Sequence, residues 1–149
     1  MRRSDYVPGL RVSLVREPSA TPAATVSGPE DAVTVIRAAI PAGDEREHFI
    51  AVFVDARNRV KGVSVVSVGT LTASLVHPRE VFRPAIVAGA AGVIVAHNHP
   101  SGEASPSSED RAATARLVKA GALLGVPLLD HVIVGAGESF YSFREQGAL

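Results

Sequence analysis

The stretch Val93-Ile94-Val95-Ala96-His97-Asn98-His99-Pro100 decides how the chain is organised. It is an apolar run that ends in two histidines one residue apart, and we predict a buried strand over residues 92–96. Side chains two positions apart on a strand point the same way, so His97 and His99 would share one face while Asn98 points to the other. Neutral imidazole is the commonest metal ligand. This strand end is therefore a candidate metal site.

A third ligand follows across a short loop. The residues Ser101-Gly102-Glu103-Ala104-Ser105-Pro106 predict a turn, and Ser107 is a good N-cap for a helix that begins there. Asp110 lies in the first turn of that helix, and the turn would let the helix present it to the two histidines. Two histidines and one carboxylate leave a fourth tetrahedral position open for water, which is typical of a catalytic zinc site. The predicted cofactor is Zn²⁺.

Each part of this pattern has a simpler interpretation on its own. A single His-x-His is weak support for a metal, and Ser-x-x-Asp is an ordinary helix start, close to a capping box. The joint pattern of His-x-His-Pro, six residues and Ser-x-x-Asp is much rarer, and it favours the metal site. Ser107 has two possible roles, capping the helix and donating a hydrogen bond to an oxyanion at the metal, and both can hold in turn.

The composition excludes several classes of protein. The chain has 149 residues, enough for one domain, and its 15 basic and 15 acidic residues cancel. Because net charge is zero, we do not expect nucleic acid as a direct ligand. The absence of cysteine excludes disulfides and thiolate zinc sites. No apolar run approaches the ~20 residues of a membrane span, and the start lacks the apolar segment of a signal peptide, so we expect a cytoplasmic protein.

The first half of the chain predicts two units. Residues 1–28 would form an N-terminal strand and a linker, with an edge strand from Leu10 to Glu17 where apolar and polar residues alternate. Residues 29–149 would form the main domain. Its helix begins at Pro29, and a central strand over Phe49 to Val54 pairs with a hairpin partner over Val60 to Val68.

The second half mixes helices with strands. Pro78 opens a helix to about Gly89, and the interior Pro84 predicts that this helix bends or begins later. A long helix over Ser107 to Leu124 follows the candidate site. Apolar strands are predicted over Val126 to Val134 and Ser139 to Phe143. The pattern predicts a three-layer α/β domain, in which helices flank a mixed β-sheet.

The site motif resembles that of the JAB/MPN family of zinc-dependent (JAMM) metallopeptidases, and the surrounding sequence is more similar to its RadC-type branch. The resemblance runs from about Tyr6 to Leu149 and implies a cytidine-deaminase-like fold. The segments that carry it are Gly69-Thr70-Leu71, Val76-His77-Pro78-Arg79-Glu80, His97-Asn98-His99-Pro100-Ser101-Gly102, Pro106-Ser107 and Leu129-Asp130-His131.

The resemblance also implies a role for each site residue. His97, His99 and Asp110 match the metal ligands, and Ser107 matches a serine that assists the tetrahedral intermediate. The family motif includes an upstream glutamate as general base. Glu47 matches it best by position, and Glu45, two residues earlier, is the alternative.

Three histidines, His48, His77 and His131, lie outside the site motif. Asp130 and His131 form a polar pair inside an apolar strand, and such a pair must find partners. Either it belongs to a second shell that orients a metal-ligating imidazole, or it is a hydrogen-bonded structural pair. We interpret His48 as a surface residue at a strand end and His77 as a helix-entry or loop residue.

Two functions follow from these observations. The first is a zinc-dependent hydrolase, similar to a metallopeptidase or isopeptidase, that acts on a peptide or an isopeptide-linked protein. The second is a metal-binding interaction domain without turnover, associated with DNA repair or DNA processing, which is the label carried by the RadC-type branch.

Overall fold

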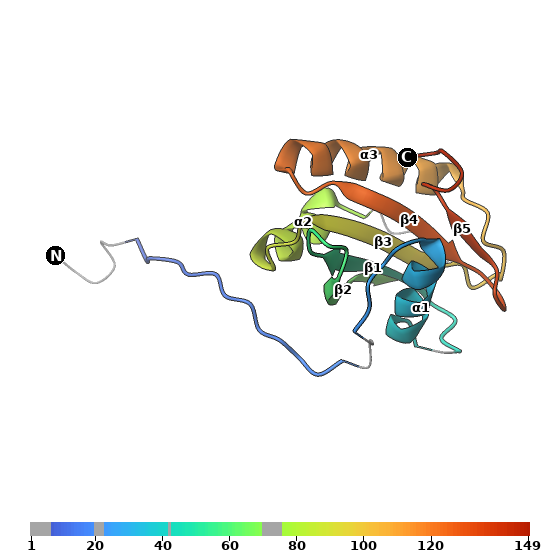
Figure 1. Ribbon diagram of the computed structural model, residues 1–149, viewed down its shortest axis with the longest axis horizontal. Helices are drawn as coiled ribbons and strands as arrows, with labels where there is room; N and C mark the ends of the chain where they lie inside the picture. Colours follow the sequence, from blue (N-terminus) through green and yellow to red (C-terminus); the bar gives the residue numbers. More distant parts are fainter. Residues whose placement is uncertain (1–6, 20–22, 42, 70–75) are drawn as a thin grey trace.

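Five strands form one mixed sheet with helices on both faces in the computed structural model, which describes residues 7–19, 23–41, 43–69 and 76–149 (Figure 1). The sheet order is β2-β1-β3-β4-β5, and within this sheet only β3 and β4 run parallel. The predicted three-layer α/β fold is confirmed. The elements are α1 (Pro29–Ala39), β1 (Glu47–Val54), β2 (Val60–Gly69), α2 (Pro78–Val87), β3 (Gly92–Asn98), α3 (Ser108–Leu124), β4 (Leu128–Val134) and β5 (Phe140–Ser142).

The sheet is buried on both faces, which explains why β1 and β3 are almost continuously apolar. On one face α2 and α3 contribute Phe82 and Leu117 to a core that includes Phe49 of β1. On the other face α1 contributes Ile36, which packs in a second core with Ile94 of β3. The two cores hold β1 and β3 side by side in the middle of the sheet, and this fixes where their ends meet.

The helix starts follow from local chemistry. Pro29 occupies the first position of α1, where its missing N–H costs nothing. Of the two alternatives for Pro84, the later start is wrong, because α2 begins at Pro78 and includes Pro84, and the bend stays a prediction. The His77 side chain accepts a hydrogen bond from the Arg79 backbone N–H, so the first turn is stabilised before Pro84 removes one bond further along. His77 is thus a helix-entry residue, as predicted.

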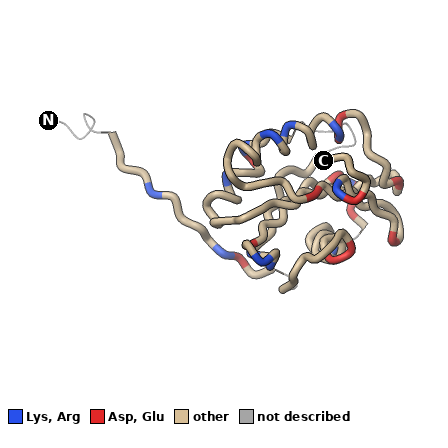
Figure 2. The backbone as a smooth tube through the Cα atoms, turned by 45° about the horizontal axis from the view of Figure 1, so that its top comes forward, with Lys and Arg blue, Asp and Glu red and all other residues tan. Residues whose placement is uncertain are grey.

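The predicted edge strand over Leu10 to Glu17 is wrong. This segment is extended and forms no strand, and it runs away from the folded part of the chain (Figures 1 and 2). Alternating residues give strand propensity, but a strand also needs a partner, and the sheet edges lie elsewhere. The chain joins the domain where Thr25 pairs with Arg59. The division of the chain at residue 28 stays a prediction.

Thr70 and Leu71, which contribute to the family resemblance, lie outside the described residues. Among the helices that the structure does describe, none combines the length and the apolar character needed to cross a bilayer.

Candidate metal centre

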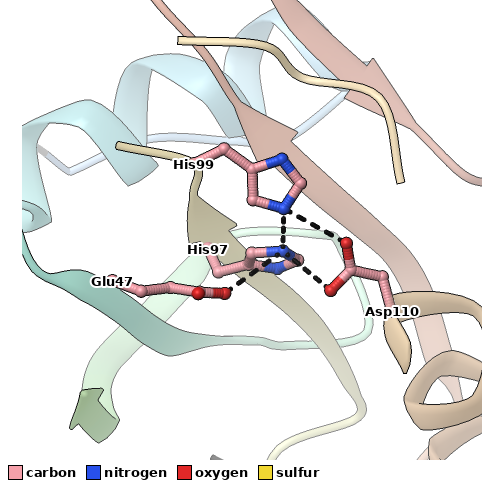
Figure 3. Close-up of side chains that lie close together, drawn as sticks. All are labelled: Glu47, His97, His99 and Asp110. Carbon is pink, nitrogen blue, oxygen red and sulfur yellow. Dashed lines mark hydrogen bonds and ion pairs between the residues drawn. The ribbon is translucent and has the colours of Figure 1, made fainter. Parts of the chain in front are cut away.

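Four side chains converge where β1 begins, β3 ends and α3 begins (Figure 3). They are Glu47, His97, His99 and Asp110, and one possible ligand atom from each lies within 4.8 Å of the others. The antiparallel pairing of Phe49 with His97 brings the start of β1 beside the end of β3. The elements that fill the two cores therefore also assemble this cluster.

The distances between the donor atoms suit one small cation. The Nε2 atoms of His97 and His99 are 3.0 Å apart. The two oxygens of Asp110 lie 3.2 Å from His97 Nε2 and 3.1 Å from His99 Nε2. Zinc bonds of about 2.0–2.1 Å in a tetrahedron separate the ligand atoms by about 3.3 Å. Two imidazoles and a carboxylate are also zinc's preferred oxygen and nitrogen ligands, so the residues present fit a zinc ion.

Glu47 belongs to the cluster but lies further out. Its Oε1 is 3.6 Å from His97 Nε2, and no shorter contact joins it to the histidines or to Asp110 among the described residues. Its side chain is 20% exposed, whereas the His97 side chain is 1% exposed, so solvent reaches the carboxylate. Glu45 is exposed, lies before β1 and is not part of the cluster. The geometry thus brings Glu47, rather than Glu45, to the candidate centre.

The ring of His99 is oriented by the loop that follows it. Its Nδ1 lies 2.8 Å from the Glu103 carbonyl oxygen, which can only accept a hydrogen bond. The proton of a neutral His99 is therefore on Nδ1, and Nε2 presents its lone pair to the centre. Contacts of this kind hold a metal-ligating histidine in one tautomer.

Asp110 is oriented by the helix start itself. The Asp110 backbone N–H donates to Ser107 Oγ at 3.0 Å, and the Ser107 N–H donates to Asp110 Oδ2 at 2.9 Å. This reciprocal capping box confirms that Ser107 is the N-cap of α3. The hydrogen bonds of the described residues join Ser107 Oγ to no other member of the cluster, so its role as an oxyanion donor stays a prediction.

The electrostatics of the cluster favour a bound cation. Burial alone would raise the pKa of Asp110, but the imidazoles of His97 and His99 beside it hold that pKa well below the usual range. The hydrogen bond with Asp110 also raises the pKa of His99 above its ordinary value of 6.5, against the opposing effect of burial. The carboxylate that would bind a metal therefore also favours a proton on His99, so proton and metal compete for this ring.

This competition predicts how zinc affinity depends on pH. A metal binds only deprotonated His99, and its pKa is raised, so affinity should be constant above that pKa and fall below it. We expect a loss of about tenfold per pH unit per displaced proton. Competition with a chromophoric chelator from about pH 5.5 to about pH 8.5 measures the profile. A zinc affinity that is the same at both ends, after correction for the chelator's own protonation, would contradict the assignment of His99.

Asn98 is a site residue whose role the sequence did not indicate. Its Oδ1 accepts from the His48 backbone N–H at 2.7 Å, and its Nδ2 donates to the Arg46 carbonyl at 3.0 Å. The backbone pairing of β1 with β3 ends at Phe49, so the Asn98 side chain continues it by one more step. The two bonds flank Glu47 and hold its backbone beside the end of β3.

The loss of these two bonds should destabilise the protein. In Asn98→Ala the partly buried His48 N–H and the exposed Arg46 carbonyl lose their partner. We expect the free energy of unfolding to fall by about 1–3 kcal/mol, chiefly because of the His48 N–H. Urea denaturation measures the change. Ser101→Ala removes a small polar side chain from the exposed loop next to Asn98 and serves as the control. Equal stability of the two variants would show that the Asn98 bonds contribute nothing.

The prediction that His48 is a surface residue is wrong. His48 is 5% exposed, and its Nε2 lies 2.9 Å from Asp44 Oδ2. The chain before β1 folds back over the strand end, so Asp44 covers the ring. The Arg46 side chain bonds the same carboxylate. Asp44 has a pKa well below its usual range, chiefly because of this bond with Arg46.

The polar pair of β4 has two separate sets of partners. The His131 ring is fully buried, and its Nε2 lies 2.8 Å from His97 Nδ1, beside the centre. Burial lowers the pKa of His131 well below 6.5. Asp130 instead accepts hydrogen bonds from the Ser142 hydroxyl and the Arg144 backbone, which tie down the chain's C-terminal turn. The position of His131 therefore fits a residue that orients the His97 imidazole, and the partners of Asp130 fit a structural role.

Comparisons with known proteins identify the family of the chain. Residues 26–148 match the family model of the RadC-like JAB domain. The chain is 48% identical to a UPF0758 protein of Rubrobacter xylanophilus over 139 residues, which are 93% of this chain and 59% of that protein. It is 56% identical to UPF0758 protein STH371 of Symbiobacterium thermophilum over 103 residues, 69% of this chain and 44% of that protein.

The match does not cover the whole of these relatives. The chain spans about half the length of the curated relatives it matches, including a UPF0758 protein of Thermotoga maritima, which is 53% identical over 105 residues, 70% of this chain and 47% of that protein. All four clustered residues lie within the matched residues 26–148. The chain belongs to the family of RadC-like JAB domains, a RadC-type branch of the JAB/MPN fold, as its motifs predicted.

Proposed function

We propose that this chain is a zinc-dependent hydrolase of amide or isopeptide bonds. The observation that carries the proposal is that the two carboxylates of the cluster lie at different distances from the histidines. Asp110 approaches both histidines within 3.2 Å, as a shared ligand would, whereas Glu47 is 3.6 Å from one histidine. Three ligands and a second carboxylate that is not a ligand match the needs of hydrolysis better than those of a closed structural site.

His97, His99 and Asp110 would hold the zinc ion. When bound, zinc supplies a Lewis acid and a water molecule whose pKa is lowered to about 7. Glu47 would take a proton from the attacking water and return it to the nitrogen of the leaving amine. Its partial exposure lets substrate and solvent approach it, while its backbone is held by Asn98.

Ser107 would complete the site. Its hydroxyl oxygen accepts from Asp110 N, so its own proton can be donated. A donor here would stabilise the carbonyl oxygen as negative charge develops on it. The proposed substrate is a peptide or an isopeptide-linked protein, because an amide leaving group needs the proton that Glu47 can deliver.

Turnover of the zinc-loaded protein tests the proposal. We expect cleavage of at least one member of a panel of peptides and isopeptide-linked conjugates, loss of cleavage with a chelator, and recovery with zinc. A wild-type protein that binds zinc at the cluster but cleaves nothing in the panel would contradict the hydrolase. That result would support the alternative of a metal-binding interaction domain without turnover.

A further inference from the structure

A chain of hydrogen bonds lies behind His97, on the side away from the other ligands. His97 Nδ1 is 2.8 Å from His131 Nε2, and His131 Nδ1 is 2.6 Å from Thr114 Oγ1. The Thr114 hydroxyl donates to the Asp110 carbonyl oxygen at 2.7 Å. This series of hydrogen bonds therefore begins at one candidate metal ligand, His97, and ends at another, Asp110.

The donor and the acceptor in each of these bonds can be deduced by starting from the Asp110 carbonyl. The Asp110 carbonyl only accepts, and the Thr114 hydroxyl has a single proton, which it gives to that carbonyl. Thr114 Oγ1 must then accept from His131, so the proton of the His131 ring is on Nδ1. All three groups are buried, so each short contact needs a proton between its two atoms.

The protonated nitrogen of His131 also determines which nitrogen of His97 carries a proton. The His131 ring is fully buried and lies between the rings of Phe49 and Phe143, and no carboxylate of the described residues forms a hydrogen bond with it, so it is neutral. With Nδ1 protonated, its Nε2 is an acceptor and must receive a proton from His97 Nδ1. His97 then presents a bare Nε2 to the centre, as a metal ligand must.

The opposite direction fails at both ends. If Thr114 donated to His131, its Oγ1 and the Asp110 carbonyl oxygen would lie 2.7 Å apart with no proton between them. His131 would then carry its proton on Nε2 and give it to His97 Nδ1. The neutral His97 would have its own proton on Nε2, at the position of the metal. Only one direction therefore places a proton in each of the three bonds from His97 to the Asp110 carbonyl and leaves His97 able to bind a metal.

We propose that His131 and Thr114 are positioning residues that hold His97 in its metal-binding tautomer. The inference rests on the proposed metal function and adds two residues to it, one from β4 and one from α3. Neither touches the centre directly. Partners of this kind typically change metal affinity by about 10–100-fold when they are replaced.

Zinc affinity of a matched pair of variants tests the role of Thr114. Thr114→Val keeps the shape of the side chain and removes the hydroxyl, whereas Thr114→Ser keeps the hydroxyl. We expect zinc to bind about tenfold or more weakly to the valine variant, and within about twofold of wild type to the serine variant. Equal affinities of the two variants would overturn the proposal. His131→Phe, which preserves the ring packing, should lose about 10–100-fold if it folds.

The tautomer itself can be observed by long-range ¹H–¹⁵N NMR of the histidine rings. We expect His131 to carry its proton on Nδ1 in both the metal-free and the zinc-loaded wild-type protein. A proton on His131 Nε2 in either state would overturn the proposal. If the protein binds no zinc, the proposed metal function fails, but the metal-free spectrum still decides the tautomer. The two failures are therefore distinguishable.

Discussion

Replacing both His97 and His99 with alanine should reduce the zinc content of the purified protein from about one ion per chain to less than about a tenth of that. The double variant loses both nitrogen ligands. Asp110 and Glu47 offer only oxygen ligands, which bind zinc too weakly to retain it during purification. Mass spectrometry of metal content after gel filtration, with protein concentration measured on the same sample, gives the ratio.

A third histidine provides the control. His77 caps α2 through the Arg79 backbone N–H and is not part of the cluster. His77→Ala should therefore keep the zinc content of the wild type, although it removes a cap worth about 1 kcal/mol. Full zinc occupancy in the double variant, or an equal loss in the His77 variant, would place the ion elsewhere.

Glu47→Gln should keep the zinc and lose turnover. The amide has nearly the same shape as the carboxylate but cannot take a proton from the attacking water. Loss of a general base typically costs about 10²–10⁴-fold in rate. We expect kcat on a substrate from the panel to fall by that factor, with KM and zinc content close to wild type.

Glu45→Gln is the matched control for this change. Glu45 is exposed, lies two residues before Glu47 and is not part of the cluster. Its variant should turn over substrate at the wild-type rate. If Glu47→Gln remains active, another group serves as the base. If Glu45→Gln is inactive instead, the choice between the two glutamates is reversed.

The centre of the fold was predictable because its signals are local. An apolar run that ends in His97 and His99 specifies a buried strand end, since side chains two apart share a face. Ser107 and Asp110 specify a helix start through a capping box whose bonds span three residues. The sequence alone therefore indicated which side chains would meet, and the family resemblance indicated the upstream glutamate.

The errors arose where tertiary contacts decide the outcome. Leu10 to Glu17 has the alternation of a strand, but a strand depends on a partner that periodicity cannot supply. His48 is buried because Asp44 folds over it, a contact specific to this loop. Thr114 is inconspicuous in a helix sequence. Only the packing of α3 against β4 brings it to His131, and so its contact could not be foreseen.

The most direct test of the metal centre is an anomalous-difference map from crystals of the zinc-loaded protein, recorded at the zinc edge. We predict a single strong peak per chain, within bonding distance of His97 Nε2, His99 Nε2 and one oxygen of Asp110. Glu47 should lie beside the ion without being one of its three protein ligands. A peak at any other place, or no peak in zinc-loaded crystals, would contradict the account.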